Sequence, residues 1–110
     1  MGFELKDTVK SMLSEDFRQR FVAEYWQTKI RYEKLKHFCD RIEASHIHDD
    51  YGITCNVNEP QHDCPLSMLR EQQTFMGQYL HILELRAVIE HIDLNDEDCL
   101  EVPEMGVSQG

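Results

Sequence analysis

The stretch FVAEYWQTKIRYEKLKHFCDRI, residues 21–42, repeats apolar or aromatic side chains at alternating intervals of four and three residues. Side chains with this spacing line one side of an α-helix. No glycine or proline occurs between Ser14 and Ala44. Ser14 can cap a helix start, and Glu15 and Asp16 suit the positive end of the helix dipole. The sequence therefore predicts one helix over residues 14–44, whose partner-facing seam is Phe21, Tyr25, Thr28, Tyr32, Leu35, Cys39 and Ile42.

A second helix is predicted over residues 64–92. Asp63 can cap its start, and Pro65 falls in its first turn, where proline is favoured. Gly52 and Pro60 mark residues 45–63 as the loop between the two helices. One face of the second helix carries a regular apolar series: Leu69, Met76, Leu80, Leu83 and Ala87.

These segments predict an all-α protein built as a long antiparallel helical hairpin. Residues 1–13 are expected to form a short N-terminal helical segment, and residues 14–94 the hairpin domain. Residues 95–110 are expected to form a flexible acidic tail, because they contain too little apolar surface to fold alone. Each helix also carries a second apolar line that one partner helix leaves uncovered: Val22, Trp26, Ile30 and Phe38 on the first, and Leu66, Phe75, Tyr79, Ile82, Val88 and Ile89 on the second. We therefore expect the N-terminal segment, a second copy of the chain or a partner protein to cover it, and we expect an oligomer.

The net charge of −10 is unevenly distributed along the 110 residues. Residues 93–110 carry six acidic side chains and no Lys or Arg, which leaves −4 for residues 1–92. No dense basic patch is present to displace the counterions of DNA, which argues against direct DNA binding. No apolar run approaches the ~20 residues that a membrane span requires, and no signal peptide opens the chain. The expectation is a cytoplasmic protein with no membrane association.

The loop and its flanks concentrate histidine and cysteine, and these are the weak candidates for metal ligands: His46, His48, Cys55, His62 and Cys64. A structural zinc site uses four such ligands, but their spacing here matches no closed zinc pattern. A Cys55–Cys64 disulfide is a further alternative, disfavoured by a reducing compartment. The preferred interpretation is a plain turn with no metal, in which the histidines suit a helix end.

Nothing in the sequence predicts catalysis or a cofactor. The only candidate nucleophile is Cys64 near His62, and its neighbours are carboxylates, which disfavour a reactive thiolate. The chain has no glycine-rich phosphate loop and no hydrolase or metallopeptidase motif. We therefore expect a binding protein and not an enzyme.

Basic and aromatic side chains alternate along the first helix: Arg18, Arg20, Lys29, Arg31, Lys34 and Lys36 lie among Tyr25, Trp26 and Tyr32. Guanidinium donors beside aromatic faces suit the recognition of phosphates and bases. The alternative is that these residues form an ordinary core face and an ordinary solvated face of one helix.

Two segments carry a family resemblance: DFRQRFVAEYWQTKIRYEKLKHF, which starts at Asp16, and CPLSMLREQQTFMGQYLHILELRAVIEHIDL, which starts at Cys64. They resemble the small helical-hairpin proteins related to a crAss-like phage protein, which occur in phages, prophages and mobile elements. The resemblance covers residues 16–44 and 64–94. The matching positions are Arg18 or Arg20, Glu24, Lys29, Ile30, Leu35 and Phe38, then Leu69, Gln72 or Gln73, Met76, Tyr79, Ile82, Leu83 and Arg86.

That hairpin is similar, more remotely, to the hairpin of the anti-CBASS and anti-Thoeris proteins that sequester nucleotide immune signals. The resemblance implies a non-enzymatic oligomer in the host cytoplasm that binds a cyclic nucleotide or an ADP-ribose-derived signal between helices of adjacent subunits. It implies ligand-binding roles for Arg18, Arg20, Tyr25, Lys29 and Arg86. The alternative is a protein-binding inhibitor of a host defence protein, such as an anti-CRISPR, that acts through an acidic or apolar helical surface.

Overall fold

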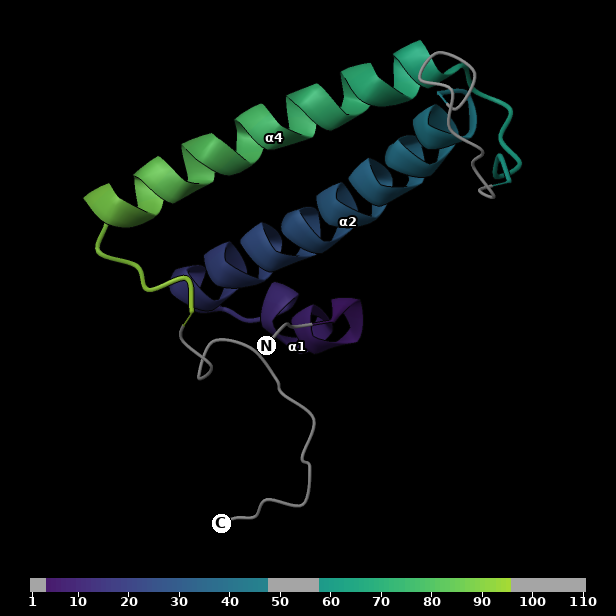
Figure 1. The fold of residues 1–110 in the computed structure, drawn as a ribbon. Coiled ribbons are helices and arrows are strands. Elements are labelled where there is room, and N and C mark those ends of the chain that lie inside the picture. The colour runs from purple at the N-terminus through teal and green to yellow at the C-terminus, as the bar shows by residue number, and fades with distance from the viewer. Residues whose placement is uncertain (1–3, 48–57, 96–110) are drawn as a thin grey trace. The chain divides into compact units, whose positions relative to one another are not determined.

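The computed structural model describes residues 4–47 and 58–95, and these residues are all-helical (Figure 1). In chain order the elements are a short 3₁₀ turn η1 (Leu5–Thr8), α1 (Val9–Met12), α2 (Phe17–Ser45) and α4 (Leu66–Ile89). The described residues contain no strand, so the predicted all-α class is confirmed. The middle of the predicted loop and nearly all of the predicted acidic tail lie outside the described residues.

The first long helix, α2, begins at Phe17, three residues after the predicted start. Asp16 supplies the cap, because its Oδ1 accepts a hydrogen bond from the backbone N–H of Arg18 over 2.9 Å. The Ser14 hydroxyl instead accepts the N–H of Asp16 over 2.9 Å and shapes the turn before the helix. At the other end α2 stops at Ser45, one residue beyond the predicted end.

The second long helix, α4, begins at Leu66 and ends at Ile89, three residues before the predicted end. His91 adopts a left-handed backbone conformation with φ 59°. The N–H of Ile92 then reaches back to the carbonyl of Ala87 over 2.8 Å, which is the hydrogen bond of a Schellman helix ending. Ile92 is buried, so the chain leaves the helix toward the core.

The chain divides into two compact units, and both long helices contribute to each. Unit 1 comprises residues 1–30 and 80–110, and unit 2 comprises residues 31–79.

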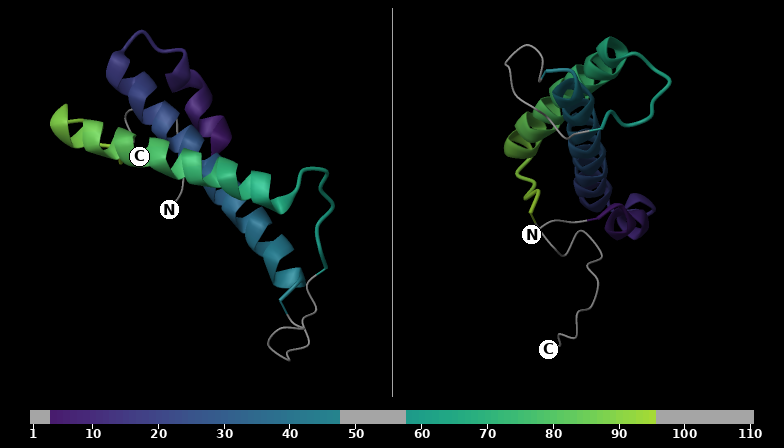
Figure 2. Two further views of the ribbon diagram at one scale, coloured as in Figure 1. Left: turned by 90° about the horizontal axis from the view of Figure 1, so that it is seen from above. Right: turned by 45° about the vertical axis from the view of Figure 1, so that its right-hand side comes forward.

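In unit 1 the first half of α2 packs against the second half of α4. The core of this unit is apolar and tightly buried: Phe21, Val22, Ala23, Tyr25, Leu80, Leu83, Ala87 and Ile92. The helices are antiparallel, because Arg18 early in α2 contacts His91 after α4, while Tyr25 contacts Glu84. The short elements η1 and α1 lie alongside the start of α2 (Figures 1 and 2). Their buried polar residues are Asp7, Thr8 and Ser11, of which Asp7 accepts the N–H of Glu4 and Thr8 donates to the carbonyl of Leu5.

In unit 2 the second half of α2 packs against the first half of α4. Cys39 and Ile42 are the buried residues of this part of α2, as the predicted seam requires. The Tyr32 ring lies close to Gly77, where an added Cβ would be only 3.3 Å from the ring. Gly77 in mid-helix therefore permits this close contact. The helices are antiparallel within this unit also, because Arg70 early in α4 contacts Glu43 near the end of α2.

Most of the second apolar line predicted on α4 is left uncovered: Phe75, Tyr79, Ile82, Val88 and Ile89 are 41% to 74% exposed, whereas Leu66 is half-buried. Met68 and Leu85 are exposed as well. The prediction was wrong for Val22 on α2, which is fully buried in the core of unit 1, and Trp26, Ile30 and Phe38 are half-buried. No helix within the described residues is both long enough and apolar enough to cross a membrane. The uncovered face is the feature on which the prediction of self-association depends.

Candidate ligand-binding site

The five residues predicted to bind a ligand all lie in unit 1. Two of them are arginines that donate hydrogen bonds to backbone carbonyls next to helix ends. The Arg18 guanidinium donates to the backbone carbonyl of His91 over 3.0 Å and to that of Glu90 over 3.4 Å. These carbonyls follow the last turn of α4, where unpaired acceptors and the negative helix dipole favour a cation. Arg20 donates to the carbonyl of Ser14 over 2.7 Å and so fixes the turn before α2.

Tyr25 is only 6% exposed and points into unit 1. Its hydroxyl donates to Oε2 of Glu84 over 2.7 Å, and its ring meets the Trp26 ring edge-on at 5.4 Å between centroids. The Trp26 indole N–H in turn donates to the carbonyl of Leu94 over 2.6 Å. A phenol held in this way stabilises the contact between the helices, and a ligand base would have to displace it in order to stack.

Arg86 and Lys29 complete the predicted set. Arg86 donates from Nε to Glu90 over 2.9 Å, and its guanidinium carbon lies 5.0 Å from the centre of the Phe21 ring, a cation–π contact. Lys29 is half-buried and also has an interaction partner. The structure therefore brings all five residues into one unit, and it gives each of them a contact within the protein.

A different group of basic residues, Lys34, His37 and Arg41, lines a hollow of about 420 Å³ on α2 in unit 2 together with Glu33 and Phe38. Lys34, His37 and Arg41 are exposed, and in the described part of the chain none of the three makes a hydrogen bond or an ion pair. They occupy positions i, i+3 and i+7 and so share one face of the helix. At a rise of ~1.5 Å per residue, Lys34 and Arg41 are about 10 Å apart along the helix axis.

The aromatic edge of this hollow is Phe38, which is half-buried and held by a neighbouring imidazole. The Phe38 and His62 rings meet edge-to-face at 6.3 Å with an interplanar angle of 88°. His62 is fixed through both ring nitrogens, with Nε2 2.8 Å from Glu59 and Nδ1 2.7 Å from the carbonyl of Cys64. The hydrogen bond to the Glu59 carboxylate raises the pKa of His62 above its usual value. Glu59 also contacts His46 over 2.9 Å, so this carboxylate joins the end of α2 to the segment before α4.

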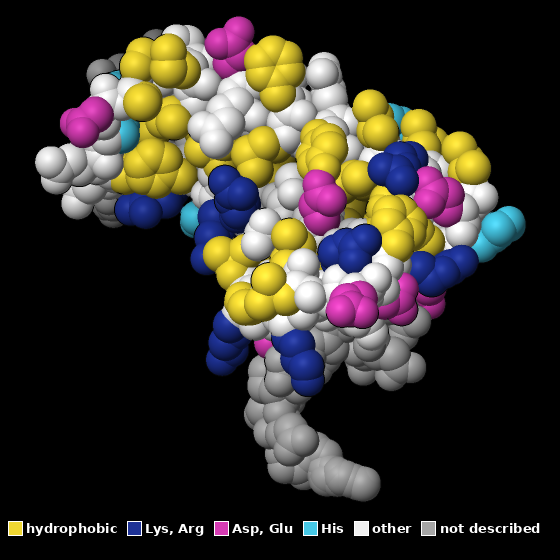
Figure 3. Space-filling view, turned by 180° about the vertical axis from the view of Figure 1, so that it is seen from behind, with side chains coloured by type: hydrophobic (Ala, Val, Ile, Leu, Met, Phe, Trp, Pro, Cys, Tyr) yellow, Lys and Arg dark blue, Asp and Glu magenta, His cyan; other side chains and the backbone are white. Residues whose placement is uncertain are grey.

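The other charged residues near this hollow are already paired. Lys36 donates to Asp40 over 2.9 Å, and Arg70 on α4 donates to Asp40 over 2.9 Å and also to Glu43. Hydrogen bonds from Lys36 and then from Arg70 hold the pKa of Asp40 below its usual range. Arg70 thus joins α4 to α2, the Lys36–Asp40 pair lies within α2, and Lys34, His37 and Arg41 face solvent. Figure 3 shows a face on which basic and hydrophobic side chains are interleaved.

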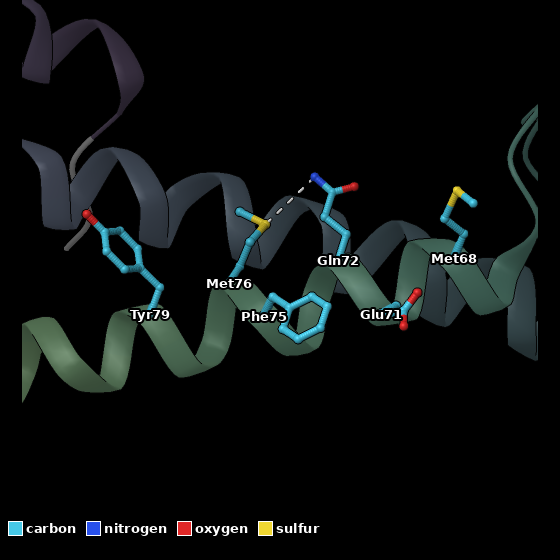
Figure 4. Close-up of a pocket in the computed structure, with 6 residues that line it drawn as sticks. All are labelled: Met68, Glu71, Gln72, Phe75, Met76 and Tyr79. Atoms are coloured by element: carbon cyan, nitrogen blue, oxygen red, sulfur yellow. Dashed lines mark hydrogen bonds between the residues drawn. The ribbon is translucent and has the colours of Figure 1, made fainter.

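A second hollow, of about 430 Å³, lies on α4 in unit 2 and is mainly apolar (Figure 4). Its lining comes from this one helix: Met68, Glu71, Gln72, Phe75, Met76 and Tyr79. The Gln72 amide lies 4.0 Å from the Met76 sulfur, a weak contact along the helix. The charged side chain of this lining is the acidic Glu71, so this hollow offers no cation to an anionic ligand.

The same contacts bear on the candidate metal ligands predicted from the sequence. Within residues 4–47 and 58–95, no group of three or more His, Cys, Asp or Glu side chains could hold a metal ion. His46 and His62 both turn to Glu59 instead. Cys64 is a free exposed thiol, so it does not form the disulfide considered from the sequence. The other two weak candidates, His48 and Cys55, lie outside the described residues.

The fold and these hollows define a class: a small helical-hairpin protein with a basic, aromatic-edged hollow on one helix and an uncovered apolar face on the other. The chain belongs to the Sequestin family, whose family model matches residues 15–89, more than half of the sequence. No curated protein and no solved structure matched the chain.

His37 and Arg41 were not predicted from the sequence as members of a basic group. Lys34 was counted among the basic residues of the helix, and Phe38 was assigned to the second apolar line. The available signal was the seven-residue interval between Lys34 and Arg41, which places both on one face, away from the buried seam.

Proposed function

We propose that this protein sequesters a small nucleotide-derived signalling molecule, such as a cyclic nucleotide or an ADP-ribose derivative, and binds it without turnover. The membership of the Sequestin family carries this proposal, because the matched residues 15–89 include both long helices and the family name denotes sequestration. The resemblance to phage hairpin proteins supports an anti-defence role for it in the cytoplasm of a host cell. Exposed basic side chains beside an aromatic ring supply the chemistry that such a ligand requires.

The proposal is tested by calorimetric titration of the full chain with a panel of cyclic dinucleotides, larger cyclic oligonucleotides and ADP-ribose derivatives. At least one member should bind with a stable heat signal and raise the melting temperature, because a ligand that binds only the folded state stabilises it. Denaturing the complex should then release the ligand chemically intact, as mass spectrometry will show. Absence of binding across the panel would remove the proposal, and release of a cleaved ligand would indicate an enzyme.

The ligand-binding residues predicted from the sequence are tested in the same assay. If Arg18, Arg20, Tyr25, Lys29 and Arg86 hold the ligand, then Arg20→Ala should abolish the ligand-induced rise in melting temperature. Arg20 already donates to the carbonyl of Ser14, so the melting temperature of the unliganded variant is the required reference.

A second candidate function is inhibition of a host defence protein by direct contact, and the exposed side chains of α4 favour it. Phe75 is 61% exposed and stands in the apolar hollow of unit 2. If the protein acts in this way, Phe75→Asp should abolish anti-defence activity in cells and leave the calorimetric affinity for a signalling ligand unchanged. If activity in cells survives Phe75→Asp, this surface does not carry the function.

A further inference from the structure

We propose that the hollow on the second half of α2 is the site that holds the anionic groups of the ligand, with Lys34 and Arg41 as its main cationic contacts. This inference rests on the proposed function and deepens it. It assigns the contacts with the ligand's anionic groups to basic residues of unit 2 instead of the unit 1 residues predicted from the sequence. The ligand class is a small molecule that carries two or more negative charges and an aromatic ring.

The cations of this hollow are available to a ligand, whereas the arginines predicted to bind it in unit 1 are not. An arginine that already donates to a carbonyl or a carboxylate must break that contact before it can bind a phosphate, and this loss opposes binding. Arg18, Arg20 and Arg86 are in this position, because each donates to a group within unit 1. Lys34 and Arg41, in contrast, make no such contact within the described residues. An anion that binds there gains charge-assisted hydrogen bonds without displacing existing ones.

The spacing of the lining residues suits a ligand with two anionic groups. Lys34 and Arg41 stand about two helical turns apart, roughly 10 Å along the axis, with His37 between them. Both side chains are long and flexible, so together they can contact two separate anionic groups of one ligand. The hollow of about 420 Å³ is lined by one helix, so these residues would contact one side of the ligand.

The aromatic ring at the edge of the hollow can contact the base of a nucleotide ligand. Phe38 is half-buried and is held edge-to-face by His62, which in turn is fixed by Glu59 and the carbonyl of Cys64. A ring held in this way loses little conformational freedom when a base packs on it. A base that stacks on an aromatic side chain contributes roughly 1–3 kcal/mol to binding in nucleic-acid complexes. Phe38 therefore supplies a contact for the base beside the contacts for the phosphates.

The local charge at the hollow differs in sign from the net charge of the chain. The chain as a whole carries a net charge of −10, so an anion is not attracted by the overall charge. Charges more than ~8 Å away are largely screened at physiological ionic strength, and the local group therefore decides. Glu33 is the acidic residue of the lining, and it already has an interaction partner. Affinity should fall as salt is raised, since the exposed cations are screened.

The experiment is calorimetric titration of the full chain with ADP-ribose and with a cyclic dinucleotide. Lys34→Ala/Arg41→Ala should weaken the affinity of the ligand that binds by about tenfold or more, since 1.4 kcal/mol corresponds to a factor of ten. The matched control is Lys6→Ala/Lys10→Ala, which also removes two positive charges, and it should change the affinity by less than about twofold because both side chains are exposed, belong to unit 1 and do not line the hollow. Phe38→Leu should weaken the affinity and leave its salt dependence intact. Circular dichroism spectra check that each variant is folded.

The outcomes separate this inference from the proposed function. If the wild type binds a ligand and Lys34→Ala/Arg41→Ala binds it equally well, the inference is wrong and the proposed function stands. If the wild type binds neither nucleotide, an NMR titration with inorganic pyrophosphate decides the site alone. Amide shift changes confined to residues 33–41 would retain an anion site there, and the absence of such changes would overturn it.

Discussion

Tyr25 on α2 donates its phenolic hydrogen bond to Glu84 on α4 over 2.7 Å, and the two side chains join the helices within unit 1. Tyr25 is 6% exposed, so the bond lies at the edge of the core and is shielded from water on one side. Tyr25, for which the family resemblance implies a ligand-binding role, therefore also holds the two helices together. The aromatic residue on the same helix that we propose for the contact with a base is Phe38, which is half-buried.

Removal of the Tyr25 hydroxyl should destabilise the protein. Tyr25→Phe keeps the ring and its packing but leaves the Glu84 carboxylate without this donor. We expect the free energy of unfolding to fall by about 1 kcal/mol, the usual contribution of such a hydrogen bond. Chemical denaturation measures it. Glu84→Gln, which retains an acceptor for the phenol, should cost less, and an equal cost in both variants would contradict this account.

Gly77 should show energetic coupling to Tyr32. Alanine is favoured over glycine in a helix interior by about 1 kcal/mol. At Gly77, however, the new Cβ would stand 3.3 Å from Cε1 of Tyr32, which must shift by a few tenths of an ångström. Gly77→Ala should therefore stabilise the protein more in a Tyr32→Leu background than in the wild type, with a coupling energy of roughly 0.5–1 kcal/mol.

Denaturation of the four proteins of this double-mutant cycle gives the coupling directly. Strict additivity of the two substitutions would show that the ring and the glycine do not constrain each other.

The Glu59–His62 pair should make the stability of unit 2 depend on pH. The His62 pKa is raised above 6.5 by Glu59, so its stabilisation is complete below pH 6.5 and is lost as the pH rises through the raised pKa. The Glu59 pKa is lowered below 4.5 by His62, so its stabilisation is complete above pH 4.5 and is lost as the pH falls through the lowered pKa. The contribution of the pair is therefore greatest between about pH 4.5 and 6.5.

Melting temperatures of the wild type and of Glu59→Gln, measured from pH 4 to 9, check this window. The difference between the two proteins should be largest between pH 4.5 and 6.5 and should shrink on both sides. Glu71→Gln removes an exposed carboxylate that makes no ion pair within the described residues, and it serves as the control. A difference that stays constant with pH would show that the pair is not formed in solution.

The uncovered apolar face of α4 should drive self-association. Phe75 and Met68 are 61% and 56% exposed and line the same hollow on α4, and contiguous apolar surface of this kind marks interaction sites. Sedimentation velocity should show a mass above that of the 13.0 kDa chain, increasing with protein concentration. Phe75→Asp should shift the protein toward the monomer, because a buried unpaired carboxylate is costly.

Gln61→Asp introduces the same charge at an exposed position outside the helices and should leave the mass unchanged. A wild type that remains monomeric at the highest concentrations would contradict the prediction of an oligomer.

Much of the fold could be predicted because helix formation is local. The four-and-three spacing from Phe21 to Ile42 gave the helix and its buried side, and the structure buries Phe21, Tyr25, Cys39 and Ile42. The helix ends were less predictable. Asp16 and Ser14 both have suitable oxygens, and the choice between them depends on the turn that Arg20 holds. The end of α4 depends on the left-handed residue His91, a conformation that a histidine seldom adopts.

The candidate site was less accessible to sequence reasoning. The sequence alone determined that the chain forms two long amphipathic helices, where its basic residues concentrate, and that apolar surface is left over, because these properties follow from composition and periodicity. Only the tertiary structure decided which Lys and Arg side chains have partners within the described residues and which remain available to bind an anion. Arg18 and Arg86 find partners on segments more than sixty residues distant or on the facing helix, whereas Lys34 and Arg41 find none within the described residues. A side chain's partner depends on which distant segment packs beside it, and that information is absent from local spacing.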